Sequence, residues 1–379
     1  MIKKIVCIMI MLAISFSAMA KKKEKDFYFS NKKFKPQNIS LLKKAWSRGL
    51  KAGSPGKRYY PETSNPVEEN GIIYVGTHAN LFYALNSSTG KNLWVYKNDE
   101  PISSTAALSS DRVVFTDLGG WVISLDKATG LLNWKQDLNY EMLGRPLVVN
   151  NRVYLLHGER EVIALSADDG HIVWNSTLPA YVQQMTMRGH SSMIPDQNSL
   201  YVGLANGRLC RLSLNDGSIV WEKNLAIPLR VFKDIDSPVV MDGDSLYVGG
   251  YFGAVYRVNK QTGAVIWSSE VATGTSPLVL DNVVVVSDTN GAVHGLDKSD
   301  GQQIWFNELE GGVLSAPVLF DAKVFVTTFE KNAYLLDTEN GYQIQKINLG
   351  GGSLNTPRVA GESVYLLTND ARLVALRKK

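Results

Sequence analysis

Residues 254–267 read AVYRVNKQTGAVIW, and they contain the pattern from which the fold can be predicted. An alternating strand, AVYRVN, leads into a tight turn that ends at Gly263, and a second strand then runs to Trp267. Glycine suits such a turn because it adopts positive φ at little cost. The stretch therefore predicts two antiparallel strands joined by a hairpin turn.

The same turn and tryptophan recur along the chain at intervals of about forty residues. The copies are STGKNLW ending at Trp94, ATGLLNW at Trp134, DDGHIVW at Trp174, NDGSIVW at Trp221, QTGAVIW at Trp267 and SDGQQIW at Trp305. A seventh copy, ENGYQIQ, carries Gln345 in place of the tryptophan. Two strands with alternating apolar residues precede each turn. Another strand, which often begins with proline, comes before these two. Four short strands per repeat are typical of a β-propeller blade.

The two ends of the chain fix the number of blades. Eight second strands occur, from GIIYVG to SVYLLT, but only seven turns with a fourth strand, since the last repeat ends at RLVALRKK. The stretch ISLLKKAW, residues 39–46, places Trp46 where an eighth outer-strand tryptophan belongs. We therefore predict an all-β, eight-bladed β-propeller of four-stranded antiparallel blades, closed by the N-terminal strand completing the last blade. Docking against a neighbouring blade is predicted for Trp46, Trp94, Trp134, Trp174, Trp221, Trp267 and Trp305.

The N-terminal residues have the pattern of a secretory signal peptide. Lys3 and Lys4 precede an apolar run over residues 5–16, and Ala18-Met19-Ala20 matches a cleavage site. We predict a cleaved signal peptide over 1–20, a basic linker over 21–38 and the propeller over 39–379. Cys7 precedes most of the apolar run and lacks small residues before it, so no lipobox is evident. Export to the periplasm follows, and only Cys210 then remains, which excludes an internal disulfide.

Charge is distributed unevenly between the linker and the propeller. Residues 21–35 carry seven lysines against Glu24 and Asp26, whereas residues 36–379 carry 31 basic and 34 acidic side chains. A nucleic-acid-binding domain is expected to be basic, so this balance argues against that class. For the linker, contact with anionic lipid headgroups and a solvated tether both stay open.

Two repeats are longer than the others, and they are consecutive. The turn glycines follow one another at 40, 40, 47, 46, 38 and 40 residues, and the additions fall in loops 179–193 and 226–237. Both loops connect an outer strand to the next inner strand, so they are expected to share one face of the ring. Their exposed Met, Leu and Arg suit a protein-binding surface. Local packing of Met185 and Met187 beneath their own loop is the alternative interpretation.

From about residue 39 the chain resembles the quinoprotein-like eight-bladed propellers, and among them the BamB family of the machinery that inserts β-barrels into the bacterial outer membrane. A hydrophobic-x-hydrophobic-Arg-Gly motif of that family matches residues 185–189, and its Asp-x-Asp pair matches residues 234–236. The resemblance implies that these loops bind a periplasmic POTRA domain of a BamA-like protein. It assigns that contact to Met185, Met187, Arg188, Asp234 and Asp236.

The resemblance also implies a non-enzymatic scaffold with no catalytic residue, no metal and no cofactor, on the inner face of the outer membrane. Unfolded outer-membrane proteins are a second class of partner. Well-known members are lipoproteins, whereas this chain shows no lipobox, so we expect membrane association through the partner rather than through a lipid anchor. A scaffold for another envelope protein is a second interpretation of the same face.

An enzyme is the alternative from a different class. Similar propellers hold pyrroloquinoline quinone with Ca²⁺ and a catalytic Asp, and they oxidise alcohols or sugars. Relatives that oxidise alcohols also carry two adjacent cysteines, which this chain lacks. None of the five histidines, His78, His157, His171, His190 and His294, has metal-ligand spacing. The sequence therefore favours a binding protein over a quinone-dependent dehydrogenase.

Overall fold

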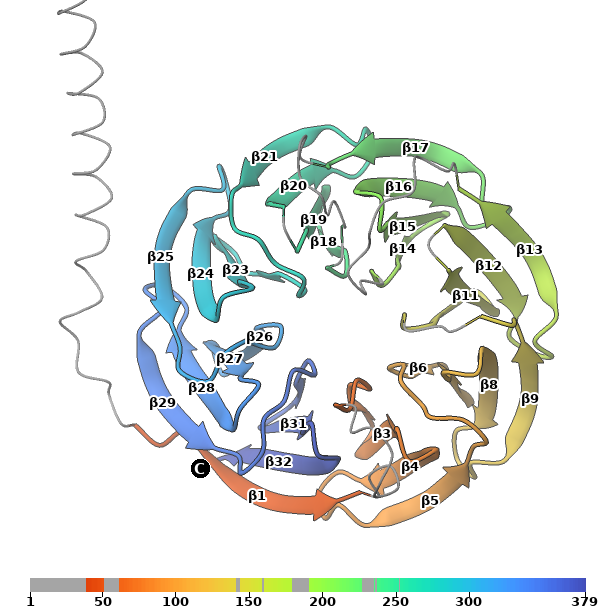
Figure 1. Ribbon diagram of the computed structural model, residues 1–379, viewed down its shortest axis with the longest axis horizontal. Helices are drawn as coiled ribbons and strands as arrows, with labels where there is room; N and C mark the ends of the chain where they lie inside the picture. The colour runs from red at the N-terminus through yellow and green to blue at the C-terminus, as the bar shows by residue number, and fades with distance from the viewer. Residues whose placement is uncertain are drawn as a thin grey trace, which may run out of the picture.

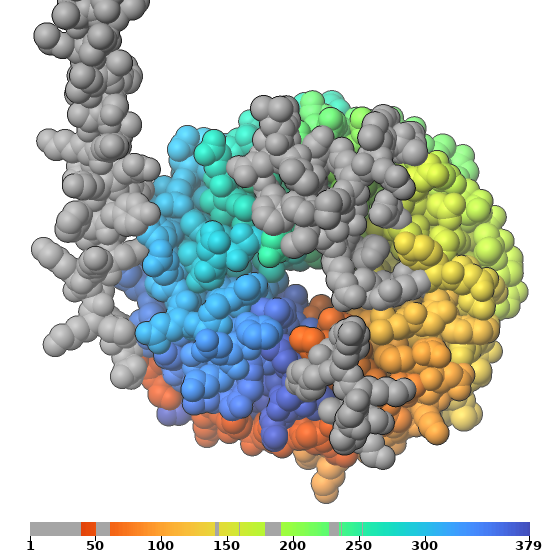
Figure 2. Space-filling view, in the orientation of Figure 1, coloured from red at the N-terminus to blue at the C-terminus, as the bar shows by residue number. Residues whose placement is uncertain are grey.

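The computed structural model describes residues 39–50, 61–140, 144–158, 160–178, 191–226, 235, 237–251 and 253–379. These residues form eight four-stranded sheets, in which every pair of neighbouring strands is antiparallel. The sheets stand as blades around a central axis (Figure 1), and they abut one another around the ring (Figure 2). The prediction of an all-β, eight-bladed propeller is confirmed.

The first strand of each blade lies nearest the central axis and the fourth lies at the rim. Blade 1 consists of β2 (Val67–Glu69), β3 (Ile72–Thr77), β4 (Leu81–Asn86) and β5 (Asn92–Lys97). Blade 2 consists of β6 (Ala107–Leu108), β7 (Arg112–Thr116), β8 (Trp121–Asp126) and β9 (Leu132–Asp137). Blade 3 consists of β10 (Leu147–Val149), β11 (Arg152–His157), β12 (Glu161–Ser166) and β13 (Ile172–Thr177). Blade 4 consists of β14 (Ile194–Asp196), β15 (Ser199–Gly203), β16 (Arg208–Ser213) and β17 (Ile219–Asn224).

The second half of the ring repeats this order. Blade 5 consists of β18 (Val240–Asp242), β19 (Ser245–Gly249), β20 (Val255–Asn259) and β21 (Val265–Ser269). Blade 6 consists of β22 (Leu278–Val279), β23 (Val283–Ser287), β24 (Ala292–Asp297) and β25 (Gln303–Glu308). Blade 7 consists of β26 (Val318–Phe320), β27 (Lys323–Thr327), β28 (Asn332–Asp337) and β29 (Gln343–Asn348). Blade 8 consists of β30 (Arg358–Ala360), β31 (Ser363–Leu367), β32 (Arg372–Lys378) and β1 (Leu42–Gly49).

The alternating strand direction gives the ring two different faces. One face, which we call the crossover face, carries the links from each outer strand to the next inner strand and the loops between second and third strands. The opposite face, the turn face, carries the turns between third and fourth strands. Both long loops, 179–193 and 226–237, belong to crossovers, on either side of blade 4.

The turn between third and fourth strands is built by two residue types. In blade 5 the side-chain oxygen of Asn259 accepts hydrogen bonds from the backbone N–H groups of Gln261 and Thr262, each at 3.0 Å. Gly263 then adopts a φ of 71°, and the seven turn glycines all lie between 69° and 77°. A side chain that caps the turn and a residue free to take positive φ together explain why Asn or Asp, or Ser in blades 3 and 4, recurs four residues before the glycine.

Each turn glycine also receives the outer-strand tryptophan of the preceding blade. The ring of Trp267 lies on Gly301 of blade 6, where an added methyl group would be 2.6 Å from the indole, and its Nε1 donates to the Lys298 carbonyl at 3.0 Å. The same contact joins Trp46 to Gly90, Trp94 to Gly130, Trp134 to Gly170, Trp174 to Gly217, Trp221 to Gly263 and Trp305 to Gly341. Each tryptophan therefore links one blade to the next.

The hydrophobic core lies between blades. Eight clusters of buried side chains each combine residues from two neighbouring blades, and together they fill all eight junctions of the ring. Leu42 on β1 belongs to the cluster between blades 7 and 8, and Trp46 packs against the cluster between blades 8 and 1. The N-terminal strand therefore contributes to both faces of its blade.

The last blade is closed by the first strand of the chain. Strand β1 pairs antiparallel with β32, with Leu42 opposite Lys378 and Gly49 opposite Arg372. The strand spans residues 42–49 rather than the stretch 39–46 that suggested it. Its partner β32 ends at Lys378, opposite Leu42, and beyond this pair the Leu41 carbonyl still accepts the N–H of Lys379 at 3.0 Å.

Gln345 fastens this strand to blade 7. Its Oε1 accepts the backbone N–H groups of Leu41 and Leu42 at 2.8 and 2.9 Å, and its Nε2 donates to the Leu42 carbonyl at 2.8 Å. Blade 8 has no turn between its third and fourth strands, because these come from opposite ends of the chain. There is consequently no turn glycine on which a blade 7 tryptophan could dock, and an amide that binds backbone groups occupies its position.

We predict that Gln345→Ala lowers the free energy of unfolding by about 2 to 3 kcal/mol, because it leaves backbone groups of Leu41 and Leu42 without partners. Urea unfolding followed by tryptophan fluorescence measures this loss. Gln343→Ala, in the same strand and without such contacts, is the control and should change stability by less than about 0.5 kcal/mol. Equal effects of the two substitutions would contradict the role given to Gln345.

We predict that Trp267→Ala destabilises the protein by about 3 to 5 kcal/mol, since it empties the contact with Gly301 at the junction of blades 5 and 6. Thermal and urea unfolding of the variant measure the effect. Val265→Ala, in the same strand but 39% exposed, serves as the control and should have little effect. A stable Trp267→Ala protein would show that this ring does not hold the blades together.

Candidate functional site

The residues predicted to bind a partner all fall on the two long crossovers. Met185, Met187, Arg188, Asp234 and Asp236 lie outside the described residues. The structure does describe where both crossovers leave and rejoin the blades, together with Ile235. We call these attachment points the feet of the crossovers. They are the part of the candidate site that lies within the described residues.

The feet of the first crossover are buried on both sides. Leu178, directly after β13, is fully buried, and its N–H donates to the Arg160 carbonyl at 2.8 Å. On the far side Ser191 and Met193 are 2% and 7% exposed. The crossover therefore starts and ends at fixed positions in blades 3 and 4.

The second crossover is fixed in the same way. The Leu225 N–H donates to the Gly207 carbonyl, and the Leu225 carbonyl accepts the Tyr256 hydroxyl, both at 2.8 Å. Ile235, the residue between the two predicted site aspartates, is 3% exposed and joins the cluster between blades 4 and 5. Its N–H donates to the Leu204 carbonyl at 3.2 Å.

The feet of the two crossovers meet at the end of β15. The Ser191 hydroxyl donates to the Ser237 carbonyl at 3.1 Å and so connects the end of one crossover to the end of the other. Between them lies Gly203, where an added methyl group would be 2.7 Å from Ile235 Cγ2 and 3.1 Å from Ser191 Oγ. Only glycine leaves room for this approach, so blade 4 brings the two feet together.

Gly203 belongs to a sequence pattern that the tryptophan repeat does not reveal. The motif Tyr-Val-Gly ends the second strand of blades 4 and 5, and in blade 1 it lies one residue before that strand ends at Thr77. In each, the glycine admits a crossover side chain: Ile102 at Gly76, Ile235 at Gly203 and Thr273 at Gly249. The motif thus marks blades whose crossover is anchored by an inserted residue, and it could have identified Ile235 as an anchor.

A buried carboxyl group lies on the crossover face at blade 1. Glu62 is 4% exposed, and its Oε2 accepts the backbone N–H of His78 at 2.9 Å. Burial raises the pKa of Glu62 to about 7, because its effect is larger than the opposing effect of the hydrogen bond from His78. The carboxyl is therefore protonated in the folded protein at pH values where it is ionised in the unfolded chain.

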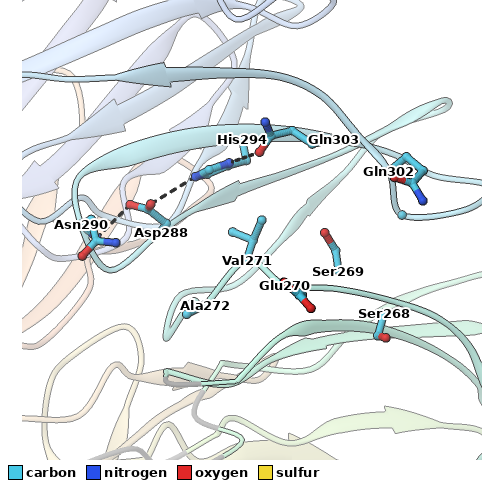
Figure 3. Close-up of a pocket in the computed structure, with 11 residues that line it drawn as sticks. Ser268, Ser269, Glu270, Val271, Ala272, Asp288, Asn290, His294, Gln302 and Gln303 are labelled. Atoms are coloured by element: carbon cyan, nitrogen blue, oxygen red, sulfur yellow. Dashed lines mark hydrogen bonds and ion pairs between the residues drawn. The ribbon is translucent and has the colours of Figure 1, made fainter. Parts of the chain in front are cut away.

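A hollow of ≈ 590 Å³ opens between blades 5 and 6 (Figure 3). In it His294 is held between Asp288, at 3.1 Å from Nε2, and the Gln303 Oε1, at 2.7 Å from Nδ1. Burial alone would raise the pKa of Asp288, but hydrogen bonds from His294 and from backbone N–H groups bring it below the usual value. His294 on β24 therefore connects Asp288, in the loop before β24, to Gln303 on β25.

This hollow does not form a nucleophilic triad. Ser268 and Ser269 line it, but the two ring nitrogens of His294 already contact Gln303 and Asp288 and form no hydrogen bond with either serine. Cys210 is fully buried, and burial, with a contribution from Glu222, raises the pKa of its thiol to about 12. A thiol in that state is not a nucleophile at neutral pH.

A quinone cofactor of the dehydrogenase type would need Ca²⁺ held by clustered oxygen ligands. Across the described ranges, no group of three or more His, Cys, Asp or Glu side chains is placed to hold a metal ion. The residues within these ranges therefore do not fit that cofactor. Within the same ranges, the structure contains no helix with the length and apolar character needed to cross a membrane.

The fold and the repeat place the chain in the class of eight-bladed propellers whose blades are linked by docked tryptophans. A family model described as outer membrane protein assembly factor BamB matches residues 97–307, 252–344 and 290–379. The chain belongs to this family. A second model, the β-propeller domain of glucose, ethanol and alcohol dehydrogenases, matches residues 16–130.

Individual relatives agree with this assignment. The assembly factor BamB of Moranella endobia (strain PCIT) is 23% identical over 305 residues, which cover 76% of each chain. That of Xanthomonas campestris pv. campestris is 27% identical over 293 residues, or 72% of this chain and 69% of the relative. A quinoprotein ethanol dehydrogenase of Pseudomonas aeruginosa is 28% identical over 169 residues, but these cover 38% of this chain and 26% of the enzyme.

A solved structure is similar over most of the ring. The crystal structure of BamB from Moraxella catarrhalis superposes with a TM-score of 0.79 at 19% identity, covering 89% of this chain and all of that one. At this identity the likeness concerns the fold alone. Two predictions made from the sequence, the propeller fold and the BamB family, are thus confirmed.

We predict that Glu62 makes stability depend on pH. Its pKa of about 7 in the folded state exceeds the ordinary value of 4.5, so its contribution to stability is complete below pH 4.5 and is lost as the pH rises through 7. Between pH 5 and pH 8 this loss amounts to about 2 to 3 kcal/mol. Glu62→Gln should remove it, and urea unfolding at both pH values measures the difference.

The exposed Glu339→Gln is the matched control for this measurement. It makes the same chemical change, so it reports the effect of losing one carboxyl group from the surface. A Glu62→Gln protein with the same pH dependence as the control would show that the Glu62 carboxyl is not buried in solution.

Proposed function

We propose that the protein is a non-enzymatic periplasmic scaffold of the outer-membrane β-barrel assembly machinery, and that loops 179–193 and 226–237 bind a POTRA domain of a BamA-like protein. Membership of the BamB family supports the assembly role, because the relatives carry that name. The position next to the outer membrane is part of the proposal, as are the signal peptide and export.

The main support for this binding site is that the two crossovers start from a common base. A hydrogen bond between Ser191 and Ser237 and the insertion of Ile235 at Gly203 hold their feet together. Two long loops that start from one rigid base can present a combined surface, whereas short crossovers elsewhere on the ring cannot. Under this proposal Met185, Met187 and Arg188 contribute from one loop, and Asp234 and Asp236 contribute beside the anchored Ile235.

The chemistry of these residues suits a protein partner. Met185 and Met187 adapt to an apolar recess, while Arg188 makes charge-assisted hydrogen bonds. Asp234 and Asp236 either contact the partner or order the first loop by pairing with Arg188. The proposal assigns membrane association to the partner rather than to a lipid anchor on this chain, and it includes unfolded outer-membrane proteins as a second class of partner.

The alternative proposal, a quinone-dependent dehydrogenase, has weaker support. The dehydrogenase relative matches 38% of the chain, whereas the assembly factors match more than two thirds. That chemistry needs Ca²⁺ beside a catalytic Asp, and across the described ranges no cluster of three or more His, Cys, Asp or Glu side chains is placed to hold a metal ion. Adding pyrroloquinoline quinone and Ca²⁺ to the purified protein and recording its absorbance spectrum tests this alternative directly.

We predict that Arg188→Ala and the double variant Met185→Ala/Met187→Ala each weaken binding to a soluble BamA POTRA array by about thirtyfold or more. Truncation of a residue central to an interface costs about 2 kcal/mol, which corresponds to this factor. Calorimetric titration measures the affinity, and thermal unfolding of the same preparations should show nearly unchanged melting temperatures.

Leu131→Ala is the matched control, because Leu131 is 68% exposed and lies on the turn face of the ring, at blade 2. Leu131→Ala should leave both the affinity for the POTRA array and the melting temperature unchanged. Unchanged affinity in all loop variants would reject the proposed site, and a loss of stability with normal binding would favour local packing of the methionines instead.

A further inference from the structure

The outer edge of blade 8 is strongly basic. Strand β1 carries Lys43, Lys44 and Arg48, and β32 with the last residue adds Arg372, Arg377, Lys378 and Lys379; we call these seven residues the basic edge. No acidic residue occurs in positions 42–49 or 372–379. The two strands run side by side at the rim of the ring, where the C-terminus lies next to the start of β1 (Figure 1).

This charge contrasts with the remainder of the propeller. Of the 31 basic side chains in residues 36–379, seven belong to the basic edge, which leaves 24 basic against 34 acidic side chains elsewhere. The seven lysines of residues 21–35 end six residues before β1 in the sequence and have the same sign of charge. Positive charge is therefore gathered at one edge of an otherwise acidic protein.

The register of the two strands places like charges together. Lys43 is directly opposite Arg377, and both side chains are exposed. Such a pair destabilises a sheet, and none of the ion pairs found among the described residues includes either side chain. Lys378 does pair with Asp321 at 2.8 Å, but Lys44 and Arg48 reach only backbone carbonyls, of Leu349 and Gly90. An external anionic partner would relieve this repulsion.

The form of the basic edge favours a surface over a small ligand or a protein. Its charges follow an exposed strand of eight residues, roughly 27 Å long, and do not converge on a pocket. The exposed residues between them on β1 are Ala45 and Ser47, so the large apolar centre typical of a protein interface is missing from this strand. A row of exposed cations matches the phosphates of a lipid surface, where each basic residue adds to binding.

We propose that the basic edge docks the protein onto a membrane surface that contains anionic lipid headgroups. Blade 8 lies across the ring from blade 4, whose neighbouring crossovers form the candidate partner site (Figure 1). Docking through the basic edge therefore leaves the feet of both crossovers uncovered. The proposal does not depend on the identity of the partner bound there.

The test uses the chain from residue 21 and vesicles of phosphatidylethanolamine in which a quarter of the lipid is either phosphatidylglycerol or phosphatidylcholine. Co-sedimentation should show binding to the phosphatidylglycerol vesicles alone, and binding should weaken as salt rises past about 0.15 M because exposed charges are screened. Lys43→Glu/Arg377→Glu should reduce the partition coefficient by about tenfold or more. This reversal keeps a like-charge pair across the strands, so the fold is disturbed little.

Lys97→Glu/Lys331→Glu is the matched control, since it makes the same change in net charge at exposed positions outside the basic edge. It should reduce binding far less than the reversal at residues 43 and 377. Equal losses in the two variants would overturn the proposal. So would undiminished binding of Lys43→Glu/Arg377→Glu, or binding that depends only on residues 21–35 in a truncated chain. Competition by inorganic phosphate at matched ionic strength would indicate a small-anion site and would overturn it as well.

Discussion

A four-stranded blade in this protein has apolar side chains on both of its faces and cannot bury either of them alone. The eight clusters of buried side chains lie between blades, and none is formed by one blade. A blade is therefore stable only when both neighbours are present, which an open array cannot provide at its ends. Closing the ring gives every blade two neighbours. The docked tryptophans and the turn glycines then set the contact between each pair of blades.

Much of this could be predicted from the sequence because the constraint is repeated. A glycine that needs positive φ and a tryptophan four residues later recur often enough to count blades, and the missing fourth strand of the last repeat pointed to Trp46 at the other end. The start of that strand was placed three residues too early, because the alternation of apolar residues continues past the point where β32 ends. The substitution of Gln345 for tryptophan was visible, but its reason was not, since it lies in a strand more than 300 residues away.

The binding site was less predictable for a physical reason. Blade strands obey a repeating pattern, whereas the two long crossovers are insertions into it, and their composition alone does not distinguish a binding surface from local packing. What holds them is a set of contacts between separate blades, such as Ser191 with Ser237 and Ile235 with Gly203. The Tyr-Val-Gly motif was the available signal for this anchoring, but its meaning becomes clear only when the inserted side chain is seen. The family comparison supports the assembly role, while the contact residues themselves rest on the motif match at 185–189 and 234–236.

The pairing of β1 with β32 also determines when the molecule can be completed. A chain is synthesised from its N-terminus, so β1 emerges first, yet its partner strand is the last to appear. Until then the N-terminal segment is a tethered strand without a sheet, and blades 1 and 7 each expose one apolar face. Bringing strands together over so long a separation is slow compared with forming the hairpins inside a blade. The final event of folding is therefore a capture of the first residues by the last, and a chain that stops short by a single strand remains an open ring.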